Sequence, residues 1–146
     1  MYRDRRLIDH VVDALGHQTQ DLIVCGRTDT GHTWVADLPE PGLGPLGGLN
    51  AAFKFAAARG FTHVLSAGVD VPNLPHDLAQ QLNGEGAGIV ADQPVVGLWP
   101  VTLAQDLNEY LDQGRRALFG FAEFVSARHV AVVPSLLNIN RPEDMA

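Results

Sequence analysis

Cysteine, lysine and long apolar runs are all scarce in this sequence of 146 residues. Cys25 is its one cysteine, so the chain cannot form an internal disulfide or a cage of thiolates. The six histidines show no spacing typical of metal ligands, and we expect no structural zinc site. No apolar run reaches the roughly 18 to 20 residues that span a bilayer, and no secretory apolar region follows the charged start. These absences predict a cytoplasmic protein with no membrane partner.

Several motifs of nucleotide-binding and nucleophilic enzymes are also absent. Lys54 is the only lysine and lies inside an expected helix, so the chain has no P-loop. No GxGxxG opens a helix after a strand, and no GxSxG elbow occurs. P-loop hydrolysis and dinucleotide redox chemistry are therefore disfavoured. Nothing marks Cys25 as a nucleophile rather than a small core residue.

Apolar residues, by contrast, make up 46% of the chain, and charged residues make up 18%. This composition can bury enough surface to offset the entropy of the chain, and it predicts one globular domain over 1–146. The formal net charge is -7, which repels nucleic-acid backbones. We therefore expect no nucleic-acid partner.

The spacing of apolar residues predicts helices and strands in alternation. Expected helices cover 7–15, 49–60, 76–82, 102–114 and 115–127. Expected strands cover 21–25, 32–36, 61–68, 87–92, 95–100 and 129–133. The Gly- and Pro-rich segment 36–50 is expected to be a loop. This order favours a three-layer α/β sheet with right-handed crossovers, in which ligands bind beyond the carboxyl ends of strands.

Asp70 follows the apolar run 61–68, which has the pattern of a strand buried on both faces. An aspartate at the carboxyl end of such a strand is well placed to hold Mg²⁺. An aspartate just before Pro72 is also a common turn residue, so both interpretations stand.

The glycine-rich stretch 42–48 precedes an expected helix. Glycines let backbone amides approach a ligand closely, and a helix N-terminus favours anions. The stretch is therefore either part of a nucleotide or phosphate site or a simple connector.

Four blocks of this sequence together resemble a known family. They are GPLGGL (44–49), VDVPNLP (69–75), YLDQGRR (110–116) and NINRPED (138–144). In this order and spacing they resemble the molybdenum cofactor guanylyltransferase family, the A-type proteins of molybdopterin-guanine dinucleotide biosynthesis. The resemblance extends over nearly the whole chain, and the closing NINRPED block is its most specific part.

The resemblance implies a Rossmann-like nucleotidyltransferase that joins GMP from GTP to the terminal phosphate of molybdopterin, with Mg²⁺ as cofactor. It implies that Asp70 is the catalytic, metal-binding residue. It also places Asn138 and Asn140 near the pterin, although either asparagine can instead cap the final turn. The residues implied on the nucleotide side are Asp37, Gly44, Pro45, Leu46, Gly47 and Gly48.

Two departures from the family pattern affect this interpretation. The family usually opens with a strand and a glycine-rich loop that cradles the triphosphate and supplies a lysine, and that segment is absent here, so we expect an N-terminally truncated sheet. Gln93-Pro94 stands where the family usually has His-Pro. The chain should then bind GTP weakly. A binding or scaffold homologue, and a cytidylyl or sugar-phosphate nucleotidyltransferase, remain alternatives.

The strands 21–25 and 61–68 would flank the absent strand, and both are too apolar for an exposed edge. We expect them either to pair with each other in a parallel ladder or to be covered by a second copy of the chain, which would make a homodimer.

Overall fold

Helices and strands are interspersed along the chain, as the sequence predicts, although they do not strictly alternate. The computed structural model describes residues 3–25, 33–38 and 44–136. Its helices are α1 (Leu7–Gly16), α2 (Pro45–Ala58), α3 (Leu78–Leu82), α4 (Ala104–Asp112), α5 (Leu118–Phe124) and the 3₁₀ turn η1 (Val101–Leu103). Its strands are β1 (Val24–Cys25), β2 (Trp34–Val35), β3 (His63–Ser66), β4 (Gly88–Val90), β5 (Gln93–Pro100) and β6 (Arg128–Val130).

The described strands form two sheets. One has four strands in the order β3-β5-β4-β6, and the other is the parallel pair β1-β2. β3 and β4 run antiparallel to β5, whereas β6 is parallel to β4. Only Ala91 and Asp92 separate β4 from β5, and so short a connection makes the two strands a hairpin. The expectation that crossovers connect the strands is therefore wrong for β4 and β5, which a short turn connects.

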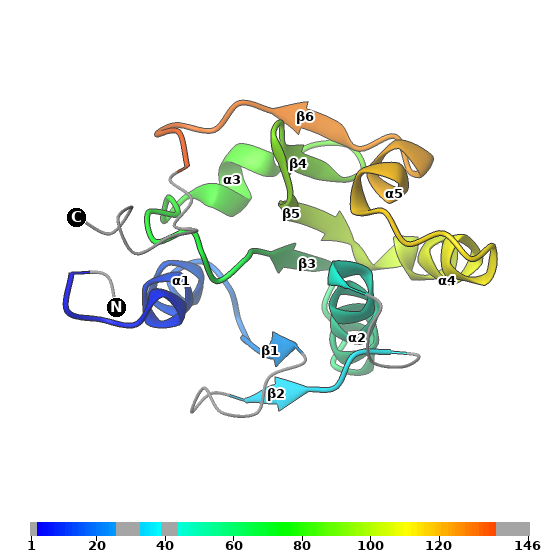
Figure 1. Ribbon diagram of the computed structural model, residues 1–146, viewed down its shortest axis with the longest axis horizontal. Coiled ribbons are helices and arrows are strands. Elements are labelled where there is room, and N and C mark those ends of the chain that lie inside the picture. The colour runs from blue at the N-terminus through cyan, green and yellow to red at the C-terminus, as the bar shows by residue number, and fades with distance from the viewer. Residues whose placement is uncertain (1–2, 26–32, 39–43, 137–146) are drawn as a thin grey trace.

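The fold has three layers, as expected (Figure 1). On one face of the four-stranded sheet, α2, α4 and α5 build a core that contains Phe53, Trp99 and Phe121. On the other face, α1 and α3 build a second core that contains Leu15, Leu78 and Val96. Side chains of β4 and β5 enter both cores because successive residues of a strand point to opposite faces. No described helix has the length and apolar character needed to cross a membrane.

Two expectations about the strands are wrong. The run 61–68 is not buried on both faces, because His63 is exposed and Val64, Leu65 and Ser66 are only partly buried. Nor do the two apolar runs pair with each other, since β1 forms its ladder with β2 and β3 forms its ladder with β5. The run is less buried than expected because β3 has a strand partner on one edge only among the described strands, and its residues line a cavity on the other side. A homodimer remains a prediction.

The expected loop over 36–50 is also shorter than predicted. α2 already begins at Pro45, whose ring fixes a φ that suits the first helical position. Gly44 precedes it with a φ of 64°, a conformation that favours glycine. The glycines at 47 and 48 thus lie within the first turns of α2 and not in a loop.

Candidate functional site

A cavity of about 880 Å³ lies between β1 and β3, and α1 and α2 also contribute to its walls. Figure 1 shows α1, β1, α2 and β3 around this part of the molecule. Four of the residues that the sequence assigns to nucleotide binding line the cavity, namely Asp37, Gly44, Pro45 and Gly48. The structure therefore brings this part of the predicted site together.

The segment that carries Asp37 is held against the start of α2. The backbone N–H of Leu38 donates to the carbonyl oxygen of Gly47 at 3.1 Å. The side-chain amide of Asn50 donates to the carbonyl oxygen of Leu38, also at 3.1 Å. Asn50 is the one buried polar side chain of the described core, so this bond fixes the segment from inside the protein. Sequence reasoning missed Asn50, although a polar residue between apolar neighbours in 46–53 was a usable signal.

Asp37 lies near Gly48 and Cys25. A Cβ atom at Gly48 would stand 3.1 Å from the Cβ of Cys25 and 3.7 Å from Oδ1 of Asp37, so only glycine fits without displacing a neighbour. Burial first, and then the Asp37 carboxylate, raise the pKa of the Cys25 thiol to about 11. The thiol also donates to the carbonyl oxygen of Gly48 at 3.4 Å. Cys25 is therefore not the thiolate that nucleophilic catalysis needs.

Asp70 lies in the turn after β3, beyond the strand's carboxyl end. Its carboxylate folds back over Gly68, where a Cβ atom would stand 2.8 Å from Oδ1. Gly68 and Val69 line the cavity, so Asp70 lies beside its rim. The Asp70 carboxylate is partly exposed and has no hydrogen-bond or ion-pair partner among the described residues. An unpaired carboxylate of this kind fits Mg²⁺, which uses one or two protein carboxylates together with water and phosphate oxygens.

The other residues predicted for the site do not line the cavity in the described structure. Leu46 is fully buried in the core with Phe53 and Trp99 and does not line the cavity. Gly47 is buried too and uses its carbonyl oxygen to hold Leu38. Asn138 and Asn140 lie outside the described residues.

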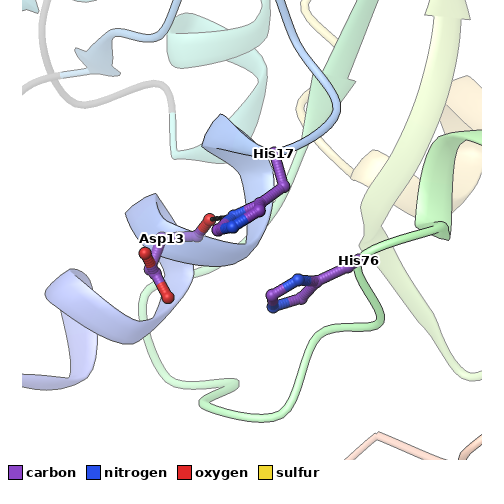
Figure 2. A group of neighbouring side chains, drawn as sticks. All are labelled: Asp13, His17 and His76. Carbon is purple, nitrogen blue, oxygen red and sulfur yellow. Dashed lines mark hydrogen bonds between the residues drawn. The ribbon is translucent and has the colours of Figure 1, made fainter.

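A second group of polar side chains lies away from the cavity (Figure 2). Asp13 and His17 stand one turn apart on α1, and His76 comes from the segment before α3. Their ligand atoms lie within 4.8 Å of one another, and all three residues are exposed. Nδ1 of His17 donates to the carbonyl oxygen of Asp13 at 2.6 Å, and the two imidazole rings lie 4.4 Å apart between centroids.

This group does not fit the magnesium expected from the sequence, because imidazole nitrogen suits zinc or copper and Mg²⁺ prefers oxygen. None of its three residues lines the cavity. The analysis of histidine spacing missed the group because His76 is far from His17 in sequence.

Residues 1–131 match the family described as the MobA-like NTP transferase domain. The chain belongs to this family. A molybdenum cofactor guanylyltransferase from Cereibacter sphaeroides is 38% identical over 159 aligned residues, which cover 97% of this chain and 80% of the relative. A molybdenum cofactor guanylyltransferase from Acidiphilium cryptum is 32% identical over 97% of this chain and 79% of the relative. The resemblance seen in the sequence is thereby confirmed.

Solved structures share this MobA-like fold. Molybdopterin-guanine dinucleotide biosynthesis protein A from Archaeoglobus fulgidus superimposes with a TM-score of 0.73 at 22% identity, over 99% of this chain and 84% of that one. A protein from Aquifex aeolicus VF5 superimposes with a TM-score of 0.78 at 17% identity, over 92% of this chain and 79% of that one. The expected Rossmann-like α/β fold class is therefore correct.

Proposed function

We propose that this chain is a molybdenum cofactor guanylyltransferase, which joins GMP from GTP to the terminal phosphate of molybdopterin and releases pyrophosphate. The observation that carries the proposal is the 38% identity to the guanylyltransferase of Cereibacter sphaeroides over 97% of the chain. A cytidylyl or sugar-phosphate transferase would share the fold, but the names of the matching relatives favour the guanylyl reaction.

The cavity beside α2 offers suitable groups for a nucleotide. The N-terminus of α2 carries a positive partial charge, and Gly44 presents no side chain to obstruct a ligand. Asp37, held by the bonds through Leu38, can accept hydrogen bonds from a ribose hydroxyl or a base N–H. Asn138 and Asn140 would contact the pterin side, on the family resemblance.

The reaction is an in-line displacement at phosphorus. An oxygen of the pterin phosphate attacks the α-phosphorus of GTP, the bond from that phosphorus to the bridging oxygen breaks, and pyrophosphate leaves with the electron pair. Asp70 would hold Mg²⁺, which when bound neutralises charge on the triphosphate. The protein's own contribution is to orient the nucleotide between Asp37 and the start of α2 and to exclude water with the apolar walls of the cavity.

Asp70→Asn tests the proposal most simply. Purified chain, GTP, Mg²⁺ and molybdopterin should yield molybdopterin-guanine dinucleotide, followed by mass spectrometry and by pyrophosphate release. Because the amide is neutral and a poorer ligand, we expect kcat/KM to fall by about 100-fold or more in the variant. Glu109→Gln removes one charge from an exposed position on α4 and serves as the matched control, with activity unchanged. Equal activity of Asp70→Asn and the original chain would overturn the role of Asp70.

The affinity for GTP should be low. Asp37 lines the cavity and Asp70 lies beside it, whereas no lysine or arginine occurs among the described lining residues. Little positive charge is therefore available to the triphosphate, and binding should depend strongly on Mg²⁺. Calorimetric titration with GTP, with and without Mg²⁺, measures this directly. Micromolar affinity without the metal would show that other groups hold the phosphates.

A further inference from the structure

The side chains of Asp13, His17 and His76 form a group of possible metal ligands that the proposed transfer reaction does not use (Figure 2). One ligand atom of each residue lies within 4.8 Å of those of the other two. Two imidazoles and one carboxylate are a donor set that suits Zn²⁺, which takes nitrogen and oxygen ligands in tetrahedral geometry. The expectation of no structural zinc came from spacing in the sequence, which cannot show a ligand that folding brings from a distant segment.

Two of the three ligands come from one end of α1. Asp13 lies in the last turns of the helix, and His17 is the residue at its C-cap. Residues four apart lie on the same face of a helix, so both side chains can reach one ion. Nδ1 of His17 lies 2.6 Å from the carbonyl oxygen of Asp13, which can only accept, so Nδ1 carries the proton. Nε2 of the neutral ring then has the lone pair that binds a metal. Metal-bound histidines commonly donate their other ring N–H to a carbonyl oxygen, which fixes the ring.

The backbone that carries His76 is fixed to α1 through Gln18. The side-chain nitrogen of Gln18 donates to the carbonyl oxygen of Pro75 at 2.9 Å, and its side-chain oxygen accepts from the N–H of Ala79 at 2.7 Å. Gln18 directly follows His17, and Pro75 directly precedes His76. The separation of the two histidines is therefore set before a metal binds. Ligands that are already held in place lose less conformational entropy on binding.

Only small movements are needed for the three side chains to coordinate one ion. Zinc bonds of about 2.0–2.2 Å place two tetrahedral ligand atoms about 3.4 Å apart. Two imidazoles on such an ion have ring centroids about 5 Å apart. The ring centroids of His17 and His76 lie 4.4 Å apart. All three side chains are exposed, so they can rotate by the amount that coordination requires.

Arg5 is a charged neighbour that competes for Asp13. Its Nη1 lies 4.0 Å from Oδ2 of Asp13, and both side chains are about half exposed. An exposed ion pair at this distance contributes little to stability, and it involves one of the two carboxylate oxygens. A metal ion can therefore replace this contact at little cost.

We propose that Asp13, His17 and His76 bind one Zn²⁺, with water at the fourth position. The ion joins the C-terminal end of α1 to the segment before α3. Residues of α1 and α3 both line the cavity, so the zinc site fixes two parts of the cavity wall relative to each other. This role is structural and goes beyond the proposed transfer reaction, and the site is separate from the Mg²⁺ that Asp70 would hold.

Calorimetric titration of the full, metal-free chain with Zn²⁺ tests the ligands. We expect a single ion to bind with micromolar affinity. Asp13→Asn, His17→Gln and His76→Gln should each weaken binding by at least about 10-fold, because each removes a ligand. His129→Gln changes an exposed histidine on β6 and is the matched control, with affinity unchanged. A large excess of Mg²⁺ should not displace the zinc, because Mg²⁺ prefers oxygen ligands.

Thermal unfolding tests the link between α1 and the segment before α3. At a Zn²⁺ concentration about 100 times its Kd, the Tm of the full chain should rise by at least about 5 °C. At the same concentration, His76→Gln should reduce this rise to about half or less, whereas His129→Gln should leave it intact. Unchanged zinc affinity in any of the three ligand variants, or a Tm that zinc does not raise, would overturn the proposal. Neither measurement uses nucleotide, so these failures are separate from failure of the transferase assay.

Discussion

The half of the molecule built on β3-β5-β4-β6 and the half built on β1 and β2 differ in how completely their strands are covered. In the first, Ile89, Val96 and Trp99 are fully buried between helices on both faces. In the second, a two-stranded sheet stands beside a cavity of about 880 Å³, and Trp34 is 47% exposed. Stability therefore resides mainly in the first half, while the second half carries the groups that a ligand can reach.

The two tryptophans give the largest contrast between these halves. Trp99 stacks on Phe121 at 5.7 Å between ring centroids and donates its indole N–H to Oγ of Ser66 at 3.0 Å. Trp99→Ala should lower the free energy of unfolding by about 3–5 kcal/mol, measured by urea denaturation. Trp34→Ala should change it by less than about 0.5 kcal/mol. Similar losses in the two variants would mean that the halves are packed alike.

Replacing one isoleucine in each half by alanine compares the packing of the two halves with the same substitution. Ile89 of β4 is fully buried within a core cluster, whereas Ile8 of α1 is 6% exposed, lines the cavity and belongs to neither core cluster. Ile89→Ala should cost about 3–5 kcal/mol, and Ile8→Ala about 1–2 kcal/mol, because Ile8 borders an existing cavity and its loss creates less new empty space in the core. Urea denaturation of both variants gives the comparison. A larger loss for Ile8→Ala would contradict it.

Cys25 gives the smallest of these effects. In the unfolded chain the thiol ionises near its ordinary pKa of 9.0, whereas in the folded protein its pKa is about 11. Between these values the unfolded state binds fewer protons, so the free energy of unfolding should decrease as pH rises. Denaturation at pH 8.5 and pH 10.5 should show a steeper decrease for the original chain than for Cys25→Ala. Equal slopes would show that β1 does not bury its thiol.

Much of the fold could be predicted from local patterns. The apolar stripes of α1 and α4 and the short apolar strands all follow from spacing along the chain. The free edge of β3 could not be predicted this way, because it depends on which distant strands pair. The start of α2 at Pro45 was missed because two glycines follow it, and glycine normally disfavours a helix.

The candidate site was predicted through family resemblance more than through local pattern. That resemblance pointed to Asp37, Gly44 and Gly48, which the structure brings to one cavity. The burial of Asn50 had a local signal, but its bond to Leu38 could not be predicted, because Leu38 belongs to another segment. The approach of His76 to His17 likewise depends on tertiary structure.

Hydrogen exchange along β3 tests the difference between the two halves most directly. Val64 and Ser66 bond to β5, whereas His63 and Leu65 direct their N–H groups to the cavity. In the chain alone, the amides of Val64 and Ser66 should exchange at least about 100-fold more slowly than those of His63 and Leu65. Uniformly slow exchange along all four residues would show that the second edge of β3 is already paired, and it would contradict the free edge of β3 beside the cavity.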